Sequence, residues 1–404
     1  MNRRRFIAAC AVGSAWIPGT RAGDLPSAGR ATIARVETFP INYRTVGRFK
    51  FFEGPKGRPS GRPAVLVKLT ASNGTVGWGQ SVPLPRWSYE TLETACSTIQ
   101  RYFAPELIGR DPADFTGVNT ALDHVVAPSF STGQPIARAG VDLALHDLAG
   151  RLSGRSAAQD WQGNRRDRVT LSWTLNPLKL ADVEGLVAQG WQRGYRHFNV
   201  KVAPDPKFDV ELCRLVKKLV PSGFLWADAN GGYDEPTAAA VLPRLADGGV
   251  AVLEQPLPAN RLTGYRRLRQ IGALPIIMDE GVVSHVELEE FIRLELLDGV
   301  AMKPARCGGL TEARRQIELL RDRGLMWLGS GLTDPDLSLA ASLLLYGAYG
   351  LTQPAALNGP QFLEGSVLRQ PLVVSGGELV VPSGPGLGVE VDEGRIAELL
   401  VRDL

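Results

Sequence analysis

Short apolar runs alternate with segments of helical periodicity from residue 169 onward. The runs cover residues 169–173, 198–202, 224–227, 250–253, 276–278, 299–302 and 326–328. Repeated strand–helix units predict a parallel sheet, because parallel neighbours need a crossover connection that is usually a helix. This many units in so short a stretch favours a closed (β/α) barrel. An open doubly wound sheet is the alternative, although no glycine-rich nucleotide fingerprint follows any of the runs.

The chain before the barrel pattern predicts a smaller α+β capping domain over residues 31–163. Two apolar runs, 63–70 and 76–79, flank Asn73-Gly74, which is typical of a β-hairpin turn. Helical patterns cover 89–103 and 136–151. Residues 43–60 are basic, aromatic and rich in Gly and Pro, so we expect a mobile loop there, of a kind that often carries specificity.

The N-terminus has the layout of an export signal over residues 1–23. Arg3-Arg4-Arg5-Phe6 precedes an apolar stretch that ends before Pro18, and this order resembles a twin-arginine signal. A bilayer-spanning helix needs roughly 20 apolar residues, so this stretch is too short for a stable membrane anchor. We expect a periplasmic or exported protein, or a cytoplasmic one if the segment is not a signal.

Composition narrows the class of partner. The 404 residues are 44% hydrophobic and 22% charged, which excludes a mainly disordered chain. A net charge of +3 is too small to indicate nucleic-acid binding, so a small molecule is the expected partner. The cysteines left after signal removal are too far apart to form a metal finger or disulfide framework; they are Cys96, Cys213 and Cys307.

One ionisable residue stands at the predicted carboxyl end of each of five successive strands. In chain order they are Lys201, Asp228, Glu254, Asp279 and Lys303, and the intervals are 27, 26, 25 and 24 residues. Each interval is about the length of one strand–helix unit, and the carboxyl ends of barrel strands converge on one mouth. A single carboxylate after a strand is usually a helix cap. Five in phase predict one site, with a lysine on each side of three carboxylates.

This set of side chains predicts metal-assisted proton transfer. Three carboxylates suit Mg²⁺, which prefers a few carboxylates plus water and substrate oxygens, and Mn²⁺ can substitute. Without a cation the carboxylates would repel one another and raise their own pKa values. Partial desolvation beside the cation would lower the pKa of Lys201 and Lys303, so each could act as a base. We expect abstraction of the α-proton of a carboxylate substrate through a metal-stabilised enediolate.

These residues resemble the enolase superfamily, and within it the mandelate racemase/muconate lactonizing enzyme group. The similar segments at the site are Asn199-Val200-Lys201, Asp228-Ala229-Asn230, Glu254-Gln255-Pro256, Asp279-Glu280 and Lys303-Pro304-x-Arg306-x-Gly308-Gly309. Others are Val76-Gly77-Trp78-Gly79, Asp142-x-Ala144-x-x-Asp147-Leu148 and Gly384-Pro385-Gly386-Leu387-Gly388, so the likeness covers nearly all of the mature chain.

The resemblance implies an α/β fold, a modified (β/α)7β TIM-like barrel under the capping domain. It places the barrel in residues 164–370 and a C-terminal segment, 371–404, back on the cap. Asp228, Glu254 and Asp279 would be the Mg²⁺ ligands, and Lys201 and Lys303 the acid/base pair. Relatives are often dimers or octamers, so a homo-oligomer is expected.

Two lysines indicate the muconate-lactonizing-like subgroup rather than the members that use a barrel histidine. The residues expected at the substrate are Asn199, Asn230, Asp334, Asn358, Arg48 and Phe51. Three features depart from the subgroup. Asn199 replaces a usual lysine, Asp334-Pro335 replaces a Glu-Ser pair, and the segment through Asn358 lacks the Asp-x-Asp that would pair a substrate ammonium. The four histidines fall at none of the expected strand ends and are interpreted as structural.

A site of this kind is compatible with more than one reaction. We expect racemisation or epimerisation of an N-substituted amino acid or related acid, because that reaction needs both lysines. A muconate-type cycloisomerase or an o-succinylbenzoate-synthase-like syn-elimination needs only one proton-transfer group and is the alternative. A hypothesis of another class is an exported carboxylate-binding protein without catalysis.

Overall fold

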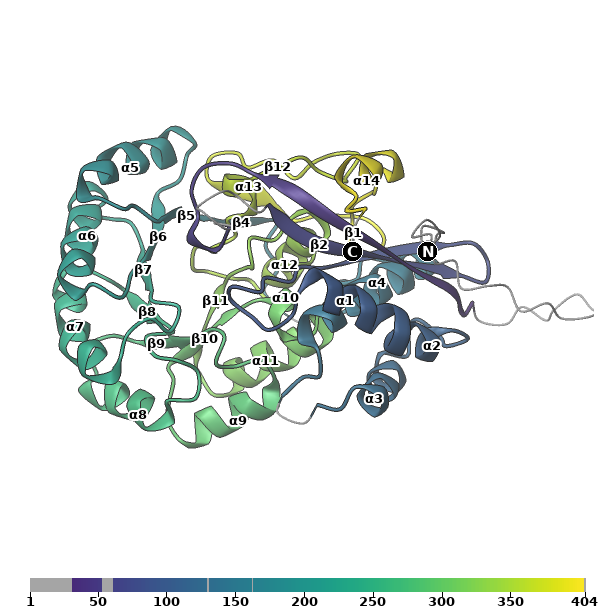
Figure 1. The fold of residues 1–404 in the computed structure, drawn as a ribbon, viewed down its shortest axis with the longest axis horizontal. Coiled ribbons are helices and arrows are strands. Elements are labelled where there is room, and N and C mark those ends of the chain that lie inside the picture. The colour runs from purple at the N-terminus through teal and green to yellow at the C-terminus, as the bar shows by residue number, and fades with distance from the viewer. Residues whose placement is uncertain (1–30, 53–60, 129–130, 162, 403–404) are drawn as a thin grey trace, which may run out of the picture.

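The computed structural model describes residues 31–52, 61–128, 131–161 and 163–402. The predicted export signal therefore lies outside the described residues. Figure 1 shows a barrel ringed by helices on one side of the molecule and a sheet with its own helices on the other. The predicted barrel with an α+β cap is confirmed, and the doubly wound alternative is wrong.

The cap is built on a four-stranded antiparallel sheet in the order β12-β1-β2-β3. Its strands are β1 (Ile33–Thr45), β2 (Arg62–Ala71), β3 (Val76–Ser81) and β12 (Leu363–Glu364). The predicted hairpin is present, since β2 and β3 pair from Val65↔Ser81 to Thr70↔Val76. Gly74 has φ 86°, a conformation that glycine adopts without a steric penalty.

Helices cover one face of the cap sheet. They are α1 (Leu92–Thr98), the π-helical turn η3 (Ile99–Phe103), α2 (Ala104–Leu107), α3 (Phe115–Val125) and α4 (Pro135–Ser153). The long helix α4 lies directly against β3, where a Cβ added at Gly79 would come within 2.0 Å of the Gly140 carbonyl oxygen. Glycine at this position allows the backbones to approach closely enough to bury nearly all of α4.

The predicted loop at 43–60 begins later than the sequence pattern indicates. Strand β1 continues to Thr45, because Tyr43 pairs with Arg62 in β2 and Thr45 pairs with Leu363 in β12. A 3₁₀ turn, η1 (Lys50–Phe52), follows. Residues 53–60 lie outside the described chain.

Seven parallel strands form the barrel wall in the order β11-β10-β9-β8-β7-β6-β5. They are β5 (Ser172–Leu175), β6 (His197–Lys201), β7 (Leu225–Asp228), β8 (Val252–Glu254), β9 (Ile276–Met278), β10 (Gly299–Met302) and β11 (Met326–Gly329). Isolated bridges complete the ring, because Ala355 pairs with Leu171 and Ala356 pairs with Ser330. A two-residue segment thus closes the barrel where the pattern predicted no strand.

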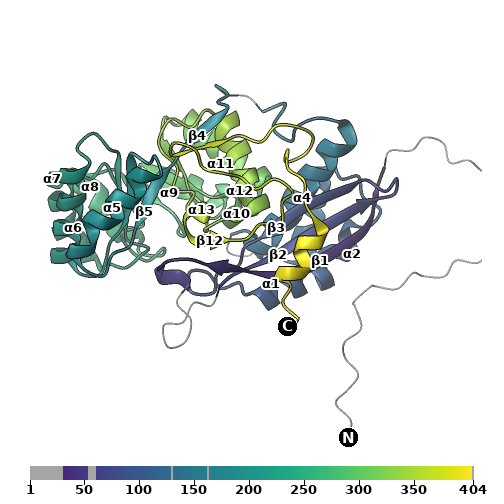
Figure 2. The same cartoon turned by 90° about the horizontal axis from the view of Figure 1, so that it is seen from above.

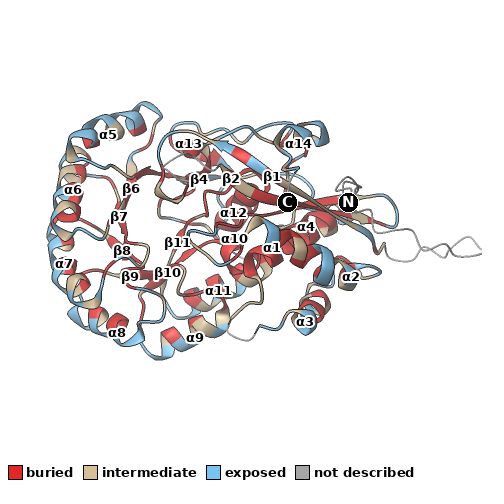
Figure 3. Cartoon of the chain, in the orientation of Figure 1, coloured by how far each residue is buried: buried red, intermediate tan, exposed pale blue. Residues whose placement is uncertain are grey.

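Helices connect the barrel strands on the outside. They are η4 (Leu180–Asp182), α5 (Val183–Gln192), α6 (Pro206–Leu219), α7 (Glu235–Asp247), α8 (Leu262–Ile271), α9 (His285–Arg293), α10 (Pro304–Cys307), α11 (Leu310–Asp322), α12 (Asp336–Ala348) and α13 (Gly359–Phe362). Figure 3 shows α5 to α9 with buried inner faces and exposed outer faces, as amphipathic helices on a sheet require. By contrast, α10 and α12 are buried throughout. Cys96, Cys213 and Cys307 are free thiols, and all three are buried.

The run predicted as one strand over residues 169–173 divides into two. Strand β4 (Arg168–Thr170) pairs antiparallel with β13 (Glu378–Val380), outside the barrel, and only β5 enters the barrel wall. The division lies at Leu171, whose N–H donates to the Gly377 carbonyl. Sequence periodicity cannot show this, because both pieces are apolar and extended.

The C-terminal residues run back across the cap. Helix α14 (Glu393–Leu399) lies beside β1 in Figure 2, and Leu400 bridges to Ile41. Lys68 of β2 binds Glu393 at 2.6 Å. These contacts join the end of the chain to the first two strands of the cap. No helix in the described ranges is long and apolar enough to cross a membrane.

Candidate active site

The barrel strands bring the five predicted ionisable residues to one mouth. Lys201, Asp228 and Glu254 are the last residues of β6, β7 and β8, and the ladder aligns Lys201 with Asp228 and Asp228 with Glu254. Asp279 and Lys303 each follow the next strand end by one residue. The regular spacing in the sequence therefore corresponds to adjacency in space.

The two lysines are paired with the carboxylates in the structure. Lys201 donates to Asp228, and Lys303 donates to Asp279. The Lys303 ammonium also lies 3.6 Å from Glu254 Oε1. Arg306 in α10, which is 1% exposed, donates to the other oxygen of Asp279. All three carboxylates are nearly inaccessible to solvent. Their negative charges are therefore stabilised by these cationic side chains and not by water.

Burial and neighbouring charges shift the pKa values of these groups in different directions. Burial, followed by repulsion from Asp228, raises the pKa of Glu254 well above its ordinary value. Burial alone would raise the pKa of Asp279, but Lys303 and Arg306 outweigh it and hold that pKa below the ordinary range. Burial would lower the pKa of Lys201, but the carboxylate of Asp228 raises it. Glu254 is thus the carboxylate least compensated by the protein.

Backbone and amide contacts fix the loops that carry these carboxylates. The Gln255 side-chain oxygen accepts from the N–H of Asp279 at 2.9 Å and of Gly281 at 3.1 Å. The Asn230 N–H donates to Asp228 at 2.9 Å. Gln255 and Asn230 both have positive φ, 38° and 46°, a conformation that non-glycine residues adopt when surrounding contacts enforce it.

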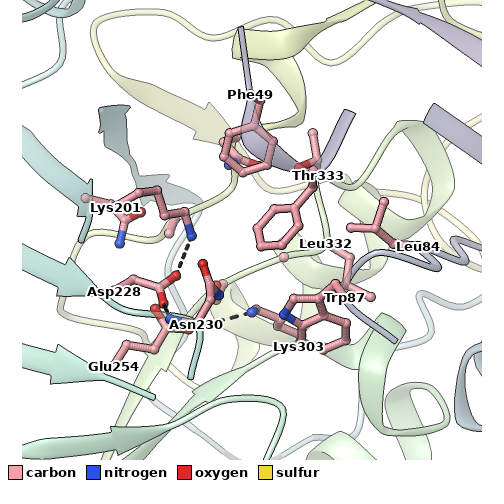
Figure 4. A pocket seen from close by; sticks show the side chains of 16 residues that line it. Phe49, Leu84, Trp87, Lys201, Asp228, Asn230, Glu254, Lys303, Leu332 and Thr333 are labelled. Carbon is pink, nitrogen blue, oxygen red and sulfur yellow. Dashed lines mark hydrogen bonds and ion pairs between the residues drawn. The ribbon is translucent and has the colours of Figure 1, made fainter. Parts of the chain in front are cut away.

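A pocket lies over this group of charges, with the barrel below and the cap above. The barrel residues that line it are Asn199, Lys201, Asp228, Asn230, Glu254, Lys303, Ser330, Gly331, Leu332, Thr333, Ala356 and Asn358. The cap contributes Phe49, Phe51, Leu84 and Trp87. Figure 4 shows the Lys201 and Lys303 ammonium groups entering the pocket from different sides, with Phe49 and Trp87 beside them. The pocket is therefore charged on the barrel side and mainly aromatic on the cap side.

Each lysine lies near an aromatic ring from the cap. The Lys201 ammonium is 5.8 Å from the centre of the Phe49 ring, and the Lys303 ammonium is 5.2 Å from that of Trp87. Cations at this range are attracted to the negative face of the ring. The sequence analysis did not identify Phe49, Leu84 or Trp87, because aromatic and apolar residues in loops carry no periodic signal.

Four of the six residues expected at the substrate line the pocket, and two do not. Asn199, Asn230, Asn358 and Phe51 are in the pocket wall. Asp334 is instead buried in its own turn, where it accepts from the Leu332 N–H at 3.2 Å and Ser342 Oγ at 3.3 Å.

Arg48, the other absent residue, contacts the barrel outside the set of residues that line the pocket. Its Nη1 donates to the Asn176 carbonyl at 3.1 Å, which places the guanidinium at an exposed position between the cap and the barrel. None of the four histidines lines the pocket. The Arg48 interaction joins residues 128 positions apart, and the Asp334 turn depends on local backbone geometry, so sequence spacing specifies neither.

The carboxylate set fits a hard divalent cation. Asp228, Glu254 and Asp279 offer only oxygen donors, which is the ligand type that Mg²⁺ and Mn²⁺ prefer. Glu254 Oε1 is buried without a hydrogen-bond partner. Within the described ranges no three His, Cys, Asp or Glu side chains already form a metal-binding group, and here the lysines take up carboxylate oxygens instead. A bound cation would compensate the mutual repulsion that raises the pKa of Glu254.

Two family profiles match most of the chain. Residues 182–395 match the family described as "Enolase C-terminal domain-like". Residues 57–159 match the "Mandelate racemase / muconate lactonizing enzyme, N-terminal domain".

Curated relatives cover most of the chain. Muconate cycloisomerase 1 of Rhodococcus opacus is 30% identical over 89% of this chain and 96% of its own length. A chloromuconate cycloisomerase of Cupriavidus necator is 32% identical over 82% of this chain and 90% of its own.

Solved structures show the same architecture. The muconate lactonizing enzyme from Pseudomonas fluorescens, crystallised with muconolactone, superposes with a TM-score of 0.85 at 25% identity, over 92% of this chain and all of that one. The 2-chloromuconate cycloisomerase from Rhodococcus opacus gives 0.83 at 29% identity, over 92% of this chain and 99% of that one. The chain therefore belongs to the enolase superfamily, in its mandelate racemase/muconate lactonizing enzyme group, whose enzymes depend on Mg²⁺ or Mn²⁺.

Proposed function

We propose that this enzyme is a cycloisomerase that converts a muconate-type diene dicarboxylate into a lactone. The observation that carries the proposal is the placement of Lys201 and Lys303 on different sides of one pocket, beside three buried carboxylates. Sequence similarity to muconate and chloromuconate cycloisomerases favours this reaction over the others that such a site can perform. Kinship also makes the protein an isomerase, so the hypothesis of a non-catalytic binding protein is set aside.

The reaction requires one new bond and one proton transfer. An oxygen of one substrate carboxylate adds to the distal double bond and forms the C–O bond of the lactone. The electron pair of that double bond moves to the carbon next to the other carboxylate. That carbon takes a proton from a lysine ammonium, and the lysine regains a proton from solvent. No oxidant or reductant is needed.

The residues of the chain have distinct parts in this reaction. Asp228, Glu254 and Asp279 would hold the divalent cation, which supplies positive charge to the substrate carboxylate as negative charge develops there. One of the two lysines donates the proton, and the other adds positive charge on the opposite side. Phe49 and Trp87 shield both ammonium groups from bulk water, which strengthens the electrostatic interactions within the pocket.

The comparisons support the cycloisomerase alternative of the sequence analysis better than its first choice, a racemase or epimerase. A racemase needs both lysines as proton-transfer groups, whereas lactone formation needs one. Two lysines are compatible with either reaction, so their presence could not decide between them. The named relatives reported above are cycloisomerases, and their similarity extends over both the cap and the barrel.

The test is to incubate the purified enzyme with cis,cis-muconate and Mg²⁺ or Mn²⁺ in D₂O and to follow the products by NMR. The expected product is the lactone with one solvent deuterium on the carbon next to the carboxylate. A parallel incubation contains N-acylamino acids. Deuterium exchange in these acids, without lactone formation from muconate, would overturn the proposal and restore the racemase.

Export and self-association remain proposals about the same protein. The arginine-rich start followed by a short apolar stretch supports export, most simply by the twin-arginine route. Fractionation of cells that express the full chain or the double variant Arg3→Lys/Arg4→Lys would test it, since loss of the arginine pair that precedes x-Phe6 should retain the protein in the cytoplasm. Light scattering on the purified protein would test the expected homo-oligomer.

A further inference from the structure

A lysine of the cap lies close to the charged group in the barrel. Lys50 begins the short turn η1, between Phe49 and Phe51, which both line the pocket. Its ammonium lies 5.1 Å from the centre of the Phe51 ring. The charges of Lys201, Asp228, Glu254 and Glu280 all act on it. Lys50 is therefore part of the electrostatic surroundings of the pocket, although it belongs to a different domain from the two lysines of the barrel.

Lys50 differs from those two lysines because it has no anionic partner among the described residues. Lys201 is paired with Asp228, and Lys303 with Asp279. Lys50 lies over the Phe51 ring, and among the described residues no ion pair or hydrogen bond joins it to another side chain. Burial, followed by repulsion from Lys201, lowers the pKa of Lys50 to about 8. A partly buried cation without a partner is unfavourable, so an anion that enters here would be stabilised.

A second unsatisfied group lies in the pocket wall, on the strand that carries Lys201. Asn199 precedes Lys201 by two residues in β6, so the two side chains leave the strand on the same face. It is 1% exposed, lines the pocket, and its Nδ2 has no hydrogen-bond partner. An amide nitrogen can only donate, so its complement is an acceptor such as a carboxylate oxygen. An unmade hydrogen bond of a buried donor is unfavourable until a ligand supplies it.

We propose that Asn199 and Lys50 form an anion-binding subsite on the β6 side of the pocket, and that it receives the second carboxylate of a dicarboxylate substrate. Asn199 donates a hydrogen bond to this carboxylate, and Lys50 provides the positive charge from the cap. The assignment of the ligand as the substrate's second carboxylate rests on the proposed function. The subsite makes the enzyme prefer a dicarboxylate to a monocarboxylate of the same length, and it links that preference to the position of the cap turn η1.

The experiment compares two unreactive ligands by calorimetry on the full chain loaded with Mg²⁺. Adipate is a dicarboxylate of the same chain length as muconate but has no double bond to lactonise, and hexanoate is the matching monocarboxylate. The variants are Lys50→Met, which removes the charge, Lys50→Arg, which keeps it, and Asn199→Leu, which removes the donor. Arg44→Met is the matched control, because it removes one positive charge from the same region of the cap at a side chain that is 82% exposed.

The expected result is that wild-type protein binds adipate more tightly than hexanoate. Lys50→Met and Asn199→Leu should each weaken adipate binding by about tenfold and leave hexanoate binding unchanged. Lys50→Arg and Arg44→Met should retain wild-type affinities. Equal affinity of wild-type protein for the two ligands, or unchanged adipate affinity in Lys50→Met, would overturn the proposal. Circular dichroism shows whether each variant is folded, and Lys50→Arg separates the loss of charge from a change in the turn.

The outcome is independent of whether the proposed reaction is correct. If muconate is not lactonised but adipate affinity still depends on Lys50 and Asn199, the proposed function fails and the subsite stands. If muconate is lactonised with unchanged KM in Lys50→Met, and adipate affinity is also unchanged, the subsite fails and the proposed function stands.

Discussion

The barrel mouth and the cap turn above it contribute to the same pocket in different ways. The barrel supplies acidic and basic groups at the ends of parallel strands, where backbone hydrogen bonds fix their separation. The cap supplies aromatic rings and the cation Lys50 from loops that follow β1 and β3. Under the proposals above, the barrel supplies the reactive groups, and the cap contributes to the choice of carboxylate substrate.

The two regions also differ in how their charges are compensated. The barrel lysines are paired with buried carboxylates, so removing one leaves an uncompensated charge in the site. Lys50 has no such partner among the described residues, so its removal should change ligand affinity with little effect on the rest of the site. Variants in the two regions should therefore have effects of different kind and size.

The largest effect is expected from the barrel lysines. Lys201→Met and Lys303→Met should each lower kcat for lactone formation, by about 10³- to 10⁴-fold for whichever lysine donates the proton and by less for the other. Steady-state kinetics with muconate, together with deuterium incorporation, would identify the donor. If either variant kept kcat within tenfold of wild type, that lysine would have no part in the chemistry.

A smaller effect is expected when one carboxylate is neutralised. Glu254→Gln should weaken Mn²⁺ binding by at least about a hundredfold, because loss of a direct ligand exceeds the loss seen for outer hydrogen-bond partners. Titration of the purified protein with Mn²⁺, followed by calorimetry, measures this. Glu290→Gln is the matched control, since its side chain is 57% exposed on α9. Equal Mn²⁺ affinity in the two variants would remove Glu254 from the cation site.

The pH dependence of adipate binding distinguishes the cap lysine from the barrel lysines. With its pKa lowered to about 8, Lys50 is charged below about pH 7 and largely neutral above about pH 9, so adipate affinity should fall about tenfold as pH rises through this range. Arginine stays charged throughout, so Lys50→Arg should show a flat profile.

The Lys50→Arg variant separates Lys50 from the other charged groups near it. Asp209 also interacts with Lys50, through charge alone. The raised pKa of Lys201 keeps that lysine charged over the same range. Among the described residues, the other charged groups that act on Lys50 are Asp228, Glu254 and Glu280. A fall in affinity that persisted unchanged in Lys50→Arg would assign the titration to one of these groups instead.

The smallest effect is expected from the aromatic side chains that the cap contributes to the pocket. Trp87→Leu removes the ring next to the Lys303 ammonium, so kcat/KM should fall by about three- to tenfold, in keeping with the strength of a cation–π contact. Trp191→Leu is the control, because that indole is 47% exposed on α5. Kinetics that do not differ between the two variants would show that the Trp87 ring contributes only apolar surface.

Several features of the fold could be predicted because they follow from local pattern. The Asn73-Gly74 hairpin, helix α4 and the β-strand runs are determined by turn chemistry and periodicity, and all are present. The split of the run at Leu171 could not be predicted, because it depends on pairing with residues remote in sequence. The strand that closes the barrel at Ala355 and Ala356 was indicated by the family resemblance but not by periodicity.

The sequence by itself determined the set of reactive groups at the barrel mouth. Strand and helix lengths fix a nearly constant interval, so Lys201, Asp228 and Glu254 must reach neighbouring strand ends once the barrel forms. Only the tertiary structure decided what surrounds them. Asp334 turns away into its own loop, and Lys50 comes close to Lys201 from another domain. The physical reason is that packing of the cap against the barrel, and not spacing along one chain segment, determines which loop side chains reach the pocket.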